Sequence, residues 1–462
     1  MFEAHVYRQR RRRLRKLLKT GLIVLPGNGE LPMNYAANAY PFRQDSTFLY
    51  FFGLDTPGLN AILDADEGRD VVYGDDIGLE DIIWMGHLPR LKERARAAGV
   101  TETAPAARYE DAVKRALSRG RKVHFLPPYH PEVRDSLSRL LGLPPEELKA
   151  GASEDLIKAV VGLRIIKSPA EVREIEAALG VTARMYREAM KTTRPGVPES
   201  EVAGRLAGLA IGGGRGTAFP TILTVNGQIL HNHDHSHVMR RGRMVVIDSG
   251  AESKSHYAAD ITRTLPVSGT FTTRQREIYE IVLDAQKTAI ASMKPGVLYR
   301  DVHLKASRVI ASGLKEMGLM KGDVDEAVAA GAHALFFPHG LGHQLGLDVH
   351  DMENLGENFV GYDDQVKRST QFGLAYLRFA RELRPGHILT VEPGIYFIPA
   401  LAAKWKKEKQ HPSFINFLKV RNYLDFGGIR IEDDVLITAS GRRVLGPPIP
   451  KTVRDVEKTM AR

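Results

Sequence analysis

One short pattern occurs twice in this chain, and the repeat limits the folds that are open to it. Residues 242–250 read Gly-Arg-Met-Val-Val-Ile-Asp-Ser-Gly, and residues 386–394 read Gly-His-Ile-Leu-Thr-Val-Glu-Pro-Gly. Each copy is a glycine, five residues typical of a buried strand, an acid, one residue and a glycine. We expect two similar halves, each of which ends a central strand in a carboxylate.

A second acid follows each copy. Asp260 comes twelve residues after Asp248, and Glu432 comes after Glu392 and an insertion. Strands that pair as neighbours place such side chains against one another at the sheet surface. A single Asp at the end of a strand more often closes a turn, but the repetition favours a site. The pattern predicts two αββ halves and a pseudo-twofold site with four carboxylates at its centre.

Four carboxylates this close repel one another unless protons or cations neutralise them. One divalent ion would leave two charges unmatched, so the pattern predicts two divalent ions. The sequence has no cysteine, and residues 338–351 supply His339, His343 and His350 as further candidate ligands. Oxygen-rich ligation without sulfur favours manganese, or else cobalt, while zinc stays compatible. Two such ions activate water and polarise a carbonyl, so the predicted reaction class is metal-assisted hydrolysis.

The chain divides by its pattern into two predicted domains, 1–160 and 161–462. The first alternates strand-like and helix-like segments and predicts a small α/β domain. Its aromatic segment 41–53 is strand-like, and Arg43 and Asp45 in it are expected to be structural partners. A capping box at residues 168–171, Ser-Pro-Ala-Glu, predicts the start of a long amphipathic helix over 172–190.

The net charge of +10 comes mostly from one segment, because eight cations and no acid lie between Arg8 and Lys19. This basic helix could attract nucleic acid or an anionic membrane, but a surface helix or one paired with acids of its own fold is favoured. No apolar run reaches the ~18 residues of a membrane span. We therefore expect no nucleic-acid or membrane partner and a cytoplasmic location.

A histidine-rich stretch precedes the first acid strand, with imidazoles at His231, His233, His235 and His237. One interpretation is an ordinary loop, and the other is an ion-binding tract. Alternate residues on a loop need not converge on one point, so the ordinary loop is favoured.

With these motifs in place, the second domain resembles the pita-bread metallopeptidases, a group that includes aminopeptidase P, prolidase and the more distant methionine aminopeptidases. The resemblance covers about residues 150–446, and the N-terminal segment 42–51 is similar to the non-catalytic domain of aminopeptidase P. The matching motifs, in order, are Ile-Leu-His231, Ile-Asp248-Ser-Gly, Ala-Asp260-Ile-Thr-Arg-Thr, His339-Gly-Leu-Gly-His343, Leu-Asp-Val-His350-Asp, Val-Glu392-Pro-Gly-Ile-Tyr and Gly-Ile-Arg430-Ile-Glu432-Asp.

The resemblance implies a role for each matching residue. Two metals would be bound by Asp248, Asp260, His343, Glu392 and Glu432, with Asp260 and Glu432 bridging. Glu392 would also carry the proton from the attacking water to the leaving nitrogen. His339 would line the site, and His231 and His350 would hold substrate and stabilise the oxyanion. Arg430 would orient Glu432.

The implied activity is removal of the residue before proline, on a fold of class α/β (α+β) with a small N-terminal domain and a pita-bread domain. Two departures are visible: a longer turn or bulge is expected near residues 253–256, and Phe219 stands where many relatives have tyrosine. Relatives are commonly dimers or tetramers, so we expect a homo-oligomer.

Arg378 and the insertion 397–426 keep a second activity open. In prolidases, which are strict Xaa-Pro dipeptidases, the matching arginine grips the carboxylate of the dipeptide. A surface helix carrying Arg378 and Arg381 at helical spacing is the structural alternative. A metal-free binding homologue or a creatinase-like enzyme is a third reading, which the presence of all five ligand positions disfavours.

Overall fold

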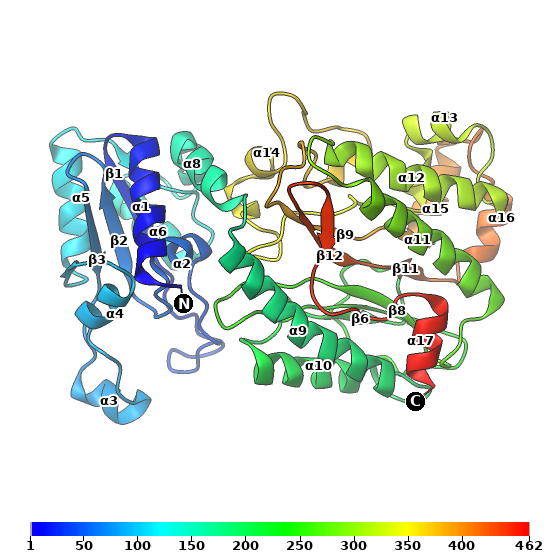
Figure 1. Cartoon of the computed structure of the whole chain (residues 1–462), viewed down its shortest axis with the longest axis horizontal. Helices are drawn as coiled ribbons and strands as arrows, with labels where there is room; N and C mark the ends of the chain where they lie inside the picture. The colour runs from blue at the N-terminus through cyan, green and yellow to red at the C-terminus, as the bar shows by residue number, and fades with distance from the viewer. Residues whose placement is uncertain (1, 462) are drawn as a thin grey trace. The chain divides into compact units, whose positions relative to one another are not determined.

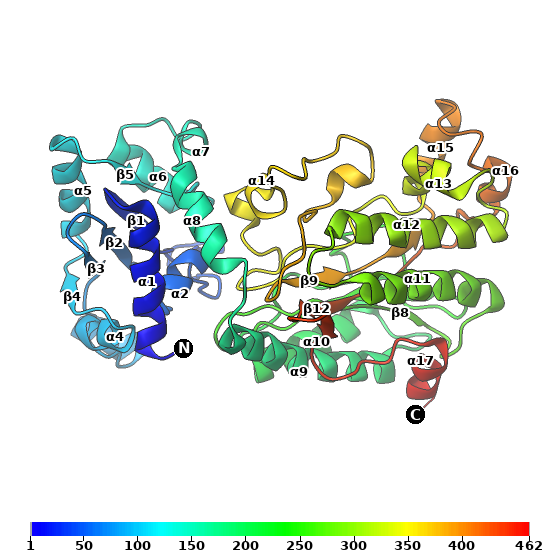
Figure 2. The same ribbon diagram turned by 45° about the horizontal axis from the view of Figure 1, so that its top comes forward.

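The computed structural model describes residues 2–461, which form two compact units (Figures 1 and 2). Unit one comprises Met1–Arg164 together with Met352–Phe359, and unit two comprises Ile165–Asp351 and Val360–Arg462. Within residues 2–461, no helix combines the length and the apolar content needed to cross a bilayer.

Unit one is built on a five-stranded mixed sheet in the order β4-β3-β2-β1-β5. The apolar core of this unit joins side chains of the sheet, such as Val24, to Tyr109 of helix α5 and Leu137 of helix α6. The strands are β1 (Leu22–Pro26), β2 (Asn60–Asp64), β3 (Arg69–Tyr73), β4 (Glu102–Ala104) and β5 (Val123–His124). The helices are α1 (Ala4–Leu18), α2 (Ser46–Phe52), α3 (Leu79–Met85), α4 (Leu91–Ala97), α5 (Arg108–Ser118), α6 (Pro131–Leu141), α7 (Leu148–Gly151) and α8 (Glu154–Arg164).

The strand-like reading of segment 41–53 was wrong, because α2 occupies most of it. Asp45 caps the helix by accepting a hydrogen bond from the Phe48 amide (2.8 Å), and Gly53 ends it in the left-handed conformation. Every residue of α2 is buried. A helix that is apolar on all sides has no amphipathic period, so its sequence resembles a buried strand.

The basic helix α1 is in part an internal clamp of unit one. Arg11 is fully buried and donates hydrogen bonds to the carbonyls of Phe51 (2.8 Å), Ala98 (3.0 Å) and Gly99 (2.9 Å). Its Nε also donates to the carboxylate of Asp70 at 2.9 Å. At least one cation of the basic helix therefore stabilises unit one from within.

Unit two contains the two similar halves that the repeat predicts. Each half begins with a helix pair, α9 (Pro169–Thr192) with α10 (Glu199–Gly213), and α11 (Thr273–Ser292) with α12 (Tyr299–Glu316). Each pair is joined by a Pro-Gly turn whose glycine amide bonds to a distant carbonyl, Gly196 to Met239 at 2.9 Å and Gly296 to Leu383 at 3.0 Å. A half is thus larger than the αββ unit expected, since two helices precede its strands.

The strands of unit two lie between these helix pairs in both views (Figures 1 and 2). They form sheets in the orders β6-β7-β8, β13-β12-β9 and β10-β11. The capping box at the start of α9 is confirmed, with Ser168 N donating to Glu171 Oε2 at 2.9 Å. The strands are β6 (Ile222–Thr224), β7 (Met244–Asp248), β8 (Thr262–Pro266), β9 (Ile388–Val391), β10 (Gly394–Tyr396), β11 (Gly428–Arg430), β12 (Asp433–Ile437) and β13 (Arg442–Val444).

Short helices complete unit two, and the insertion 397–426 carries three of them. The α-helices are α13 (Val324–Ala329), α15 (Pro399–Lys407), α16 (Phe417–Val420) and α17 (Val453–Met460). The 3₁₀ helices are η1 (Ala332–Leu335), η3 (Leu374–Tyr376) and η4 (Arg421–Tyr423). Two further short helices, η2 (Glu353–Leu355) and α14 (Glu357–Val360), begin in the segment Met352–Phe359 that belongs to unit one.

Two buried histidines make the stability of unit two depend on pH. The rings of His303 on α12 and His333 on η1 have centroids 6.3 Å apart. Neither the Nδ1 nor the Nε2 atom of either ring has a hydrogen-bond partner among residues 2–461. Burial lowers the pKa of His303 to about 3 and that of His333 to about 4. Both rings are therefore neutral in the folded protein at neutral pH.

Because the folded pKa values lie below the ordinary value, the unfolded chain takes up these protons first as the pH falls. The free energy of unfolding should fall below pH ~6.5 by about 1.4 kcal/mol per pH unit for each histidine. His303→Phe removes one of the two histidines and should therefore lower this slope by about 1.4 kcal/mol per pH unit. Urea unfolding at pH 7 and pH 5 measures the slope, and equal slopes in wild type and variant would show that His303 does not contribute.

Candidate metal centre

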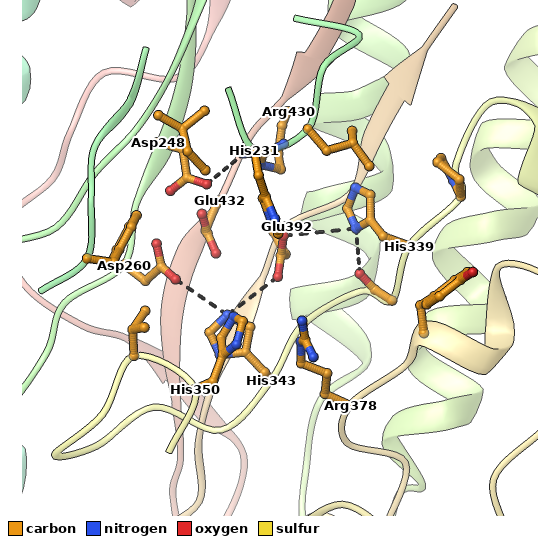
Figure 3. A pocket seen from close by; sticks show the side chains of 18 of the residues that line it. His231, Asp248, Asp260, His339, His343, His350, Arg378, Glu392, Arg430 and Glu432 are labelled. Carbon is orange, nitrogen blue, oxygen red and sulfur yellow. Dashed lines mark hydrogen bonds and ion pairs between the residues drawn. The ribbon is translucent and has the colours of Figure 1, made fainter. Parts of the chain in front are cut away.

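The four predicted acids come from the ends of neighbouring strands and line one cavity. Asp248 is the last residue of β7, and Asp260 precedes β8 by two residues. In the second half, Glu392 directly follows β9, and Glu432 lies between β11 and β12. All four line a cavity of about 770 Å³ in unit two. The repeat therefore brings its four carboxylates together (Figure 3).

Glycines allow the backbone to approach this centre closely. A Cβ atom at Gly250 would lie 1.6 Å from the carbonyl oxygen of Ala259, beside Asp260. A Cβ at Gly342 would lie 2.1 Å from the carbonyl oxygen of Thr390. No side chain fits at either position, which explains the glycines that follow Asp248 and precede His343. Residues 254–255 form a turn in the first hairpin, and its greater length than in relatives stays a prediction.

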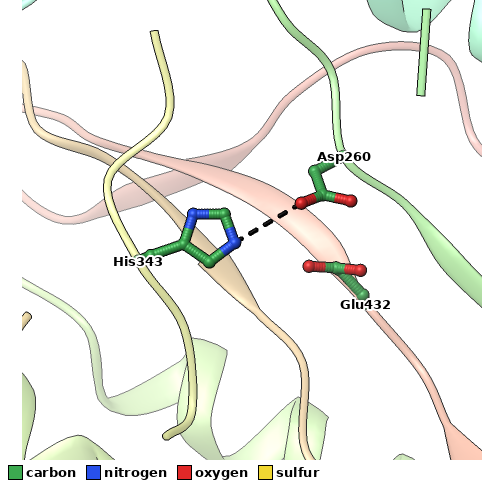
Figure 4. A group of neighbouring side chains, drawn as sticks. All are labelled: Asp260, His343 and Glu432. Atoms are coloured by element: carbon green, nitrogen blue, oxygen red, sulfur yellow. Dashed lines mark ion pairs between the residues drawn. The ribbon is translucent and has the colours of Figure 1, made fainter. Parts of the chain in front are cut away.

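Asp260, His343 and Glu432 offer ligand atoms that all lie within 4.8 Å of one another (Figure 4). His343 Nε2 is 3.4 Å from Asp260 Oδ2 and 3.6 Å from Glu392 Oε1. His343 Nδ1 lies 3.1 Å from the carbonyl oxygen of Gln344, so Nδ1 carries the hydrogen and Nε2 presents a lone pair. Three acceptors thus converge on one point, an arrangement that a cation between them stabilises.

The raised pKa values of the acids also indicate a site for cations. Burial, reinforced by the neighbouring carboxylates, raises the pKa of Asp260 and of Glu432 well above the ordinary value. Burial also raises the pKa of Glu392 to about 8. Asp248 Oδ1 and Asp260 Oδ1 are buried without a hydrogen-bond partner among residues 2–461. The donor set of carboxylate oxygens and one imidazole nitrogen therefore suits divalent ions.

A hydrogen-bond network behind the acids holds two of them in place. Arg430 Nη2 donates to Asp248 Oδ2 at 2.6 Å, and Arg430 Nε donates to Thr262 Oγ1 at 3.1 Å. The Thr262 hydroxyl in turn donates to Glu432 Oε2 at 2.6 Å. Arg430 therefore contacts Asp248 directly and reaches Glu432 through Thr262.

Tyr396 extends this network to His339. Arg430 Nη1 donates to the Tyr396 hydroxyl at 2.9 Å, and that hydroxyl lies 2.9 Å from His339 Nε2. His339 Nδ1 lies 2.8 Å from the carbonyl oxygen of Gly340, so it carries the hydrogen and Tyr396 donates to Nε2. Burial and the nearby Arg430 lower the pKa of His339 to about 3, so its ring is neutral.

The other predicted site residues line the same cavity. His231, His350 and Arg378 are among its lining residues, and the rings of His343 and His350 meet edge to face with centroids 4.2 Å apart. Phe219 also lines the cavity. Arg378 follows η3 in an irregular segment, so the surface-helix alternative was wrong.

The ion-binding reading of the histidine tract finds no support. His235 Nε2 lies 3.1 Å from the carbonyl oxygen of Thr221, and His237 Nδ1 lies 3.2 Å from Glu199 Oε2. Of residues 2–461, the group formed by Asp260, His343 and Glu432 alone brings three or more ligand atoms within 4.8 Å.

One buried ion pair fixes the loop between His343 and His350, and no motif in the sequence predicts it. Lys167 Nζ lies 2.8 Å from Asp351 Oδ2 and 3.1 Å from Gln344 Oε1. The side chains of Lys167 and Asp351 are 1% and 2% exposed. Gln344 follows His343 and Asp351 follows His350, so one ammonium group holds both ends of the loop.

Such a cage of carboxylates and imidazole, set where two similar halves meet, defines a hydrolase that works through carboxylate-held divalent ions. Comparison with known families agrees. Residues 173–439 match the model of metallopeptidase family M24, and residues 7–124 match the N-terminal domain of aminopeptidase P. The chain belongs to metallopeptidase family M24.

Two characterised types of relative are equally similar in sequence. The chain is 32% identical to human Xaa-Pro dipeptidase, over 97% of this chain and 91% of the relative. It is also 32% identical to Xaa-Pro aminopeptidase of Escherichia coli, over 98% of this chain and 97% of the relative.

Solved structures match the whole chain. An aminopeptidase of Pseudomonas aeruginosa superposes with a TM-score of 0.81 at 29% identity, and covers 100% of this chain and 98% of its own. Aminopeptidase P of Escherichia coli with the inhibitor Pro-Leu superposes with a TM-score of 0.80 at 30% identity and the same coverage.

The Lys167–Asp351 pair yields a prediction. Lys167→Met should leave a buried carboxylate without its cation and lower the free energy of unfolding by about 3–5 kcal/mol. Urea unfolding measures the loss. Lys191→Met, an exposed lysine on the same helix α9, is the matched control and should change stability by less than ~0.5 kcal/mol. Equal small effects of both variants would show that the pair contributes little.

Proposed function

We propose that the protein is a dinuclear-metal exopeptidase that hydrolyses the bond between an N-terminal residue and a following proline, with Xaa-Pro dipeptides among its substrates. The observation that carries the proposal is the cage of Asp248, Asp260, His343, Glu392 and Glu432 at one end of a cavity large enough for a peptide end. The Xaa-Pro activity of the relatives named above supports it. Full retention of the five ligand positions argues against a metal-free or creatinase-like role.

In this proposal the five residues would hold two divalent ions, manganese in preference to cobalt or zinc, and Asp260 and Glu432 would serve both ions. The ions supply Lewis-acid chemistry, which polarises the peptide carbonyl and activates water. Glu392 carries the proton from the water to the leaving proline nitrogen, and Thr390 Oγ1, 3.4 Å away, orients it. His231 and His350 hold the substrate and stabilise the developing oxyanion. The Arg430–Tyr396 network keeps His339 neutral and in place.

A strict Xaa-Pro dipeptidase is the second candidate, and Arg378 favours it. This arginine is half-buried and lines the cavity together with residues of the insertion helix α15. A guanidinium there could bind the free carboxylate of a dipeptide. The cytoplasmic location and the non-catalytic role of residues 1–160 stay predictions.

We also propose a homo-oligomer, a dimer or tetramer. The support is helix α3 of unit one, which has no buried residue. Its apolar side chains Leu79, Ile83, Trp84 and Met85 are 74%, 69%, 77% and 82% exposed. An exposed patch of this composition is typical of an interaction surface, and light scattering gives the oligomer size.

The dinuclear proposal predicts a metal stoichiometry. Elemental analysis after manganese loading and desalting should give about two ions per chain, because four carboxylates balance two divalent charges. A chelator should remove metal and activity together. Asp260→Asn should lose metal, since a bridging ligand serves both ions. One ion per chain in a fully active enzyme would contradict the proposal.

The proton-carrying role of Glu392 predicts a loss in turnover. Glu392→Gln keeps an oxygen ligand but cannot accept a proton, so kcat should fall by at least about a hundredfold. The comparison is made at equal metal content, measured for both proteins. A metal-replete Glu392→Gln enzyme with near-normal kcat would exclude the role.

Arg378 separates the two candidate activities. Arg378→Ala should lower kcat/KM for Xaa-Pro dipeptides by roughly ten- to a hundredfold, and for Xaa-Pro-Yaa peptides by much less. The assay compares Ala-Pro with Ala-Pro-Ala in wild type and variant. Arg384→Ala is the control, because Arg384 is an exposed arginine of the same segment that does not line the cavity. Equal losses on both substrates would make Arg378 structural.

A further inference from the structure

The charged residues of the cavity are sorted by sign. Its acids are Asp248, Asp260, Glu392 and Glu432, and all four belong to the proposed metal cage. Away from the cage, the charged residues that line the cavity are the cations Arg368, Arg378 and Lys404. No acid other than the four of the cage lines the cavity, so a ligand that reaches its outer part meets cationic side chains.

Arg368 and Lys404 lie at the outer part of the cavity. Both are exposed, as are Phe372 and Tyr376 beside them (39% and 54% exposed), whereas Arg378 is half-buried. We call these exposed residues, Arg368, Phe372, Tyr376 and Lys404, the cationic rim. The carbonyl of Lys404 accepts a hydrogen bond from the Glu408 amide, but within residues 2–461 its side chain takes part in no hydrogen bond or ion pair. Its ammonium group is therefore available to a ligand.

Packing between two chain segments fixes the cationic rim. Arg368 Nε donates to the carbonyl of Ala375 at 3.0 Å, which ties it to the segment that carries Tyr376 and Arg378. Phe372 packs edge to face on Tyr376 and on Trp405 of α15, each with ring centroids 5.9 Å apart. Trp405 is buried and is the neighbour of Lys404. The aromatic contacts thus hold both cations on one built surface.

The position of Arg378 indicates which part of a substrate would contact the cationic rim. Resting on the proposed function, Arg378 meets a carboxylate directly after the proline. Because Arg378 is half-buried whereas Arg368 and Lys404 are exposed in the same cavity, a longer peptide would extend from Arg378 toward these two cations. The next residue of such a peptide therefore lies beside two cations and two aromatic rings.

We propose that the cationic rim recognises a carboxylate one residue beyond the proline. The preferred longer substrates are Xaa-Pro-Yaa peptides in which Yaa is acidic, is the C-terminal residue, or both. The shared chemistry is a carboxylate, from either the side chain or the chain terminus. Exposed charges act mainly on binding, so the preference lies in KM and weakens as salt screens it.

The test compares Ala-Pro-Glu, Ala-Pro-Gln and Ala-Pro-Gln amide on the manganese-loaded enzyme. Each carboxylate removed should lower kcat/KM by about three- to tenfold through KM, and the steps should shrink in 0.5 M salt. A lower kcat/KM for Ala-Pro-Gln than for Ala-Pro-Glu shows that the side-chain carboxylate is recognised. A lower kcat/KM for the amide than for Ala-Pro-Gln shows that the terminal carboxylate is recognised. Equal kcat/KM values for all three peptides would overturn the proposal.

Lys404→Glu should lower the Ala-Pro-Glu to Ala-Pro-Gln ratio by about tenfold, because it replaces attraction with repulsion. Lys406→Glu changes the net charge equally from the same helix, is exposed and does not line the cavity, so the ratio should stay at the wild-type value. Arg368→Gln keeps a donor for Ala375 and removes the charge, and should lower the ratio as well. Equal ratios in wild type and in Lys404→Glu would contradict the proposal.

Binding of the product-like dipeptides Pro-Glu and Pro-Gln, measured by calorimetry, tests the cationic rim without turnover. The loaded wild type should bind Pro-Glu about three- to tenfold more tightly, and Lys404→Glu should not. This measurement also separates two failures. An enzyme that cleaves no Xaa-Pro bond refutes the proposed function, whereas cleavage and binding without charge preference refute the cationic rim.

Discussion

Repulsion among four carboxylates in one buried cavity is the constraint on which the rest of unit two depends. Strand β7 ends at Asp248 and strand β9 ends directly before Glu392, and both strands are fully buried, so the chain cannot move these acids apart without losing its core. Polar neighbours relieve part of the conflict. Arg430 faces Asp248, Thr262 donates to Glu432, and Thr390 donates to Glu392. The remaining charge calls for cations, and this is the state that a metallopeptidase uses.

The sequence predicted those parts of the site that local pattern determines. Asp248 and Glu392 stand at the ends of strands with a repeated signature, and Ser168 with Glu171 forms a capping box visible within four residues. Residues whose role depends on distant partners were missed. Tyr396 and Thr262 are ordinary strand residues in the sequence. The pairing of β10 with β11 brings Tyr396 to Arg430, and the contact of β8 with β11 brings Thr262 to the same arginine.

Long separation along the chain also explains why the roles of other residues were not predicted from the sequence. Lys167 and Asp351 are 184 positions apart, and neither belongs to a motif, so pattern alone could not pair them. Arg11 looked like one of many surface cations, but three carbonyls from two other segments bury it. Helix α2 was read as a strand because an apolar run buried on every side shows neither helical nor strand periodicity.

The arrangement of charge also bears on the choice between the two Xaa-Pro activities. A strict dipeptidase needs something that penalises a longer chain, either a closed end or an unfavourable charge beyond the proline. In this cavity Arg378 is half-buried, whereas the lining residues of the cationic rim are exposed cations and aromatic rings. On the proposed assignment, these exposed cations would attract a further carboxylate instead of rejecting it. Such a cavity would accept dipeptides through Arg378 and longer chains through the cationic rim, which is the behaviour expected of an aminopeptidase that retains dipeptidase activity.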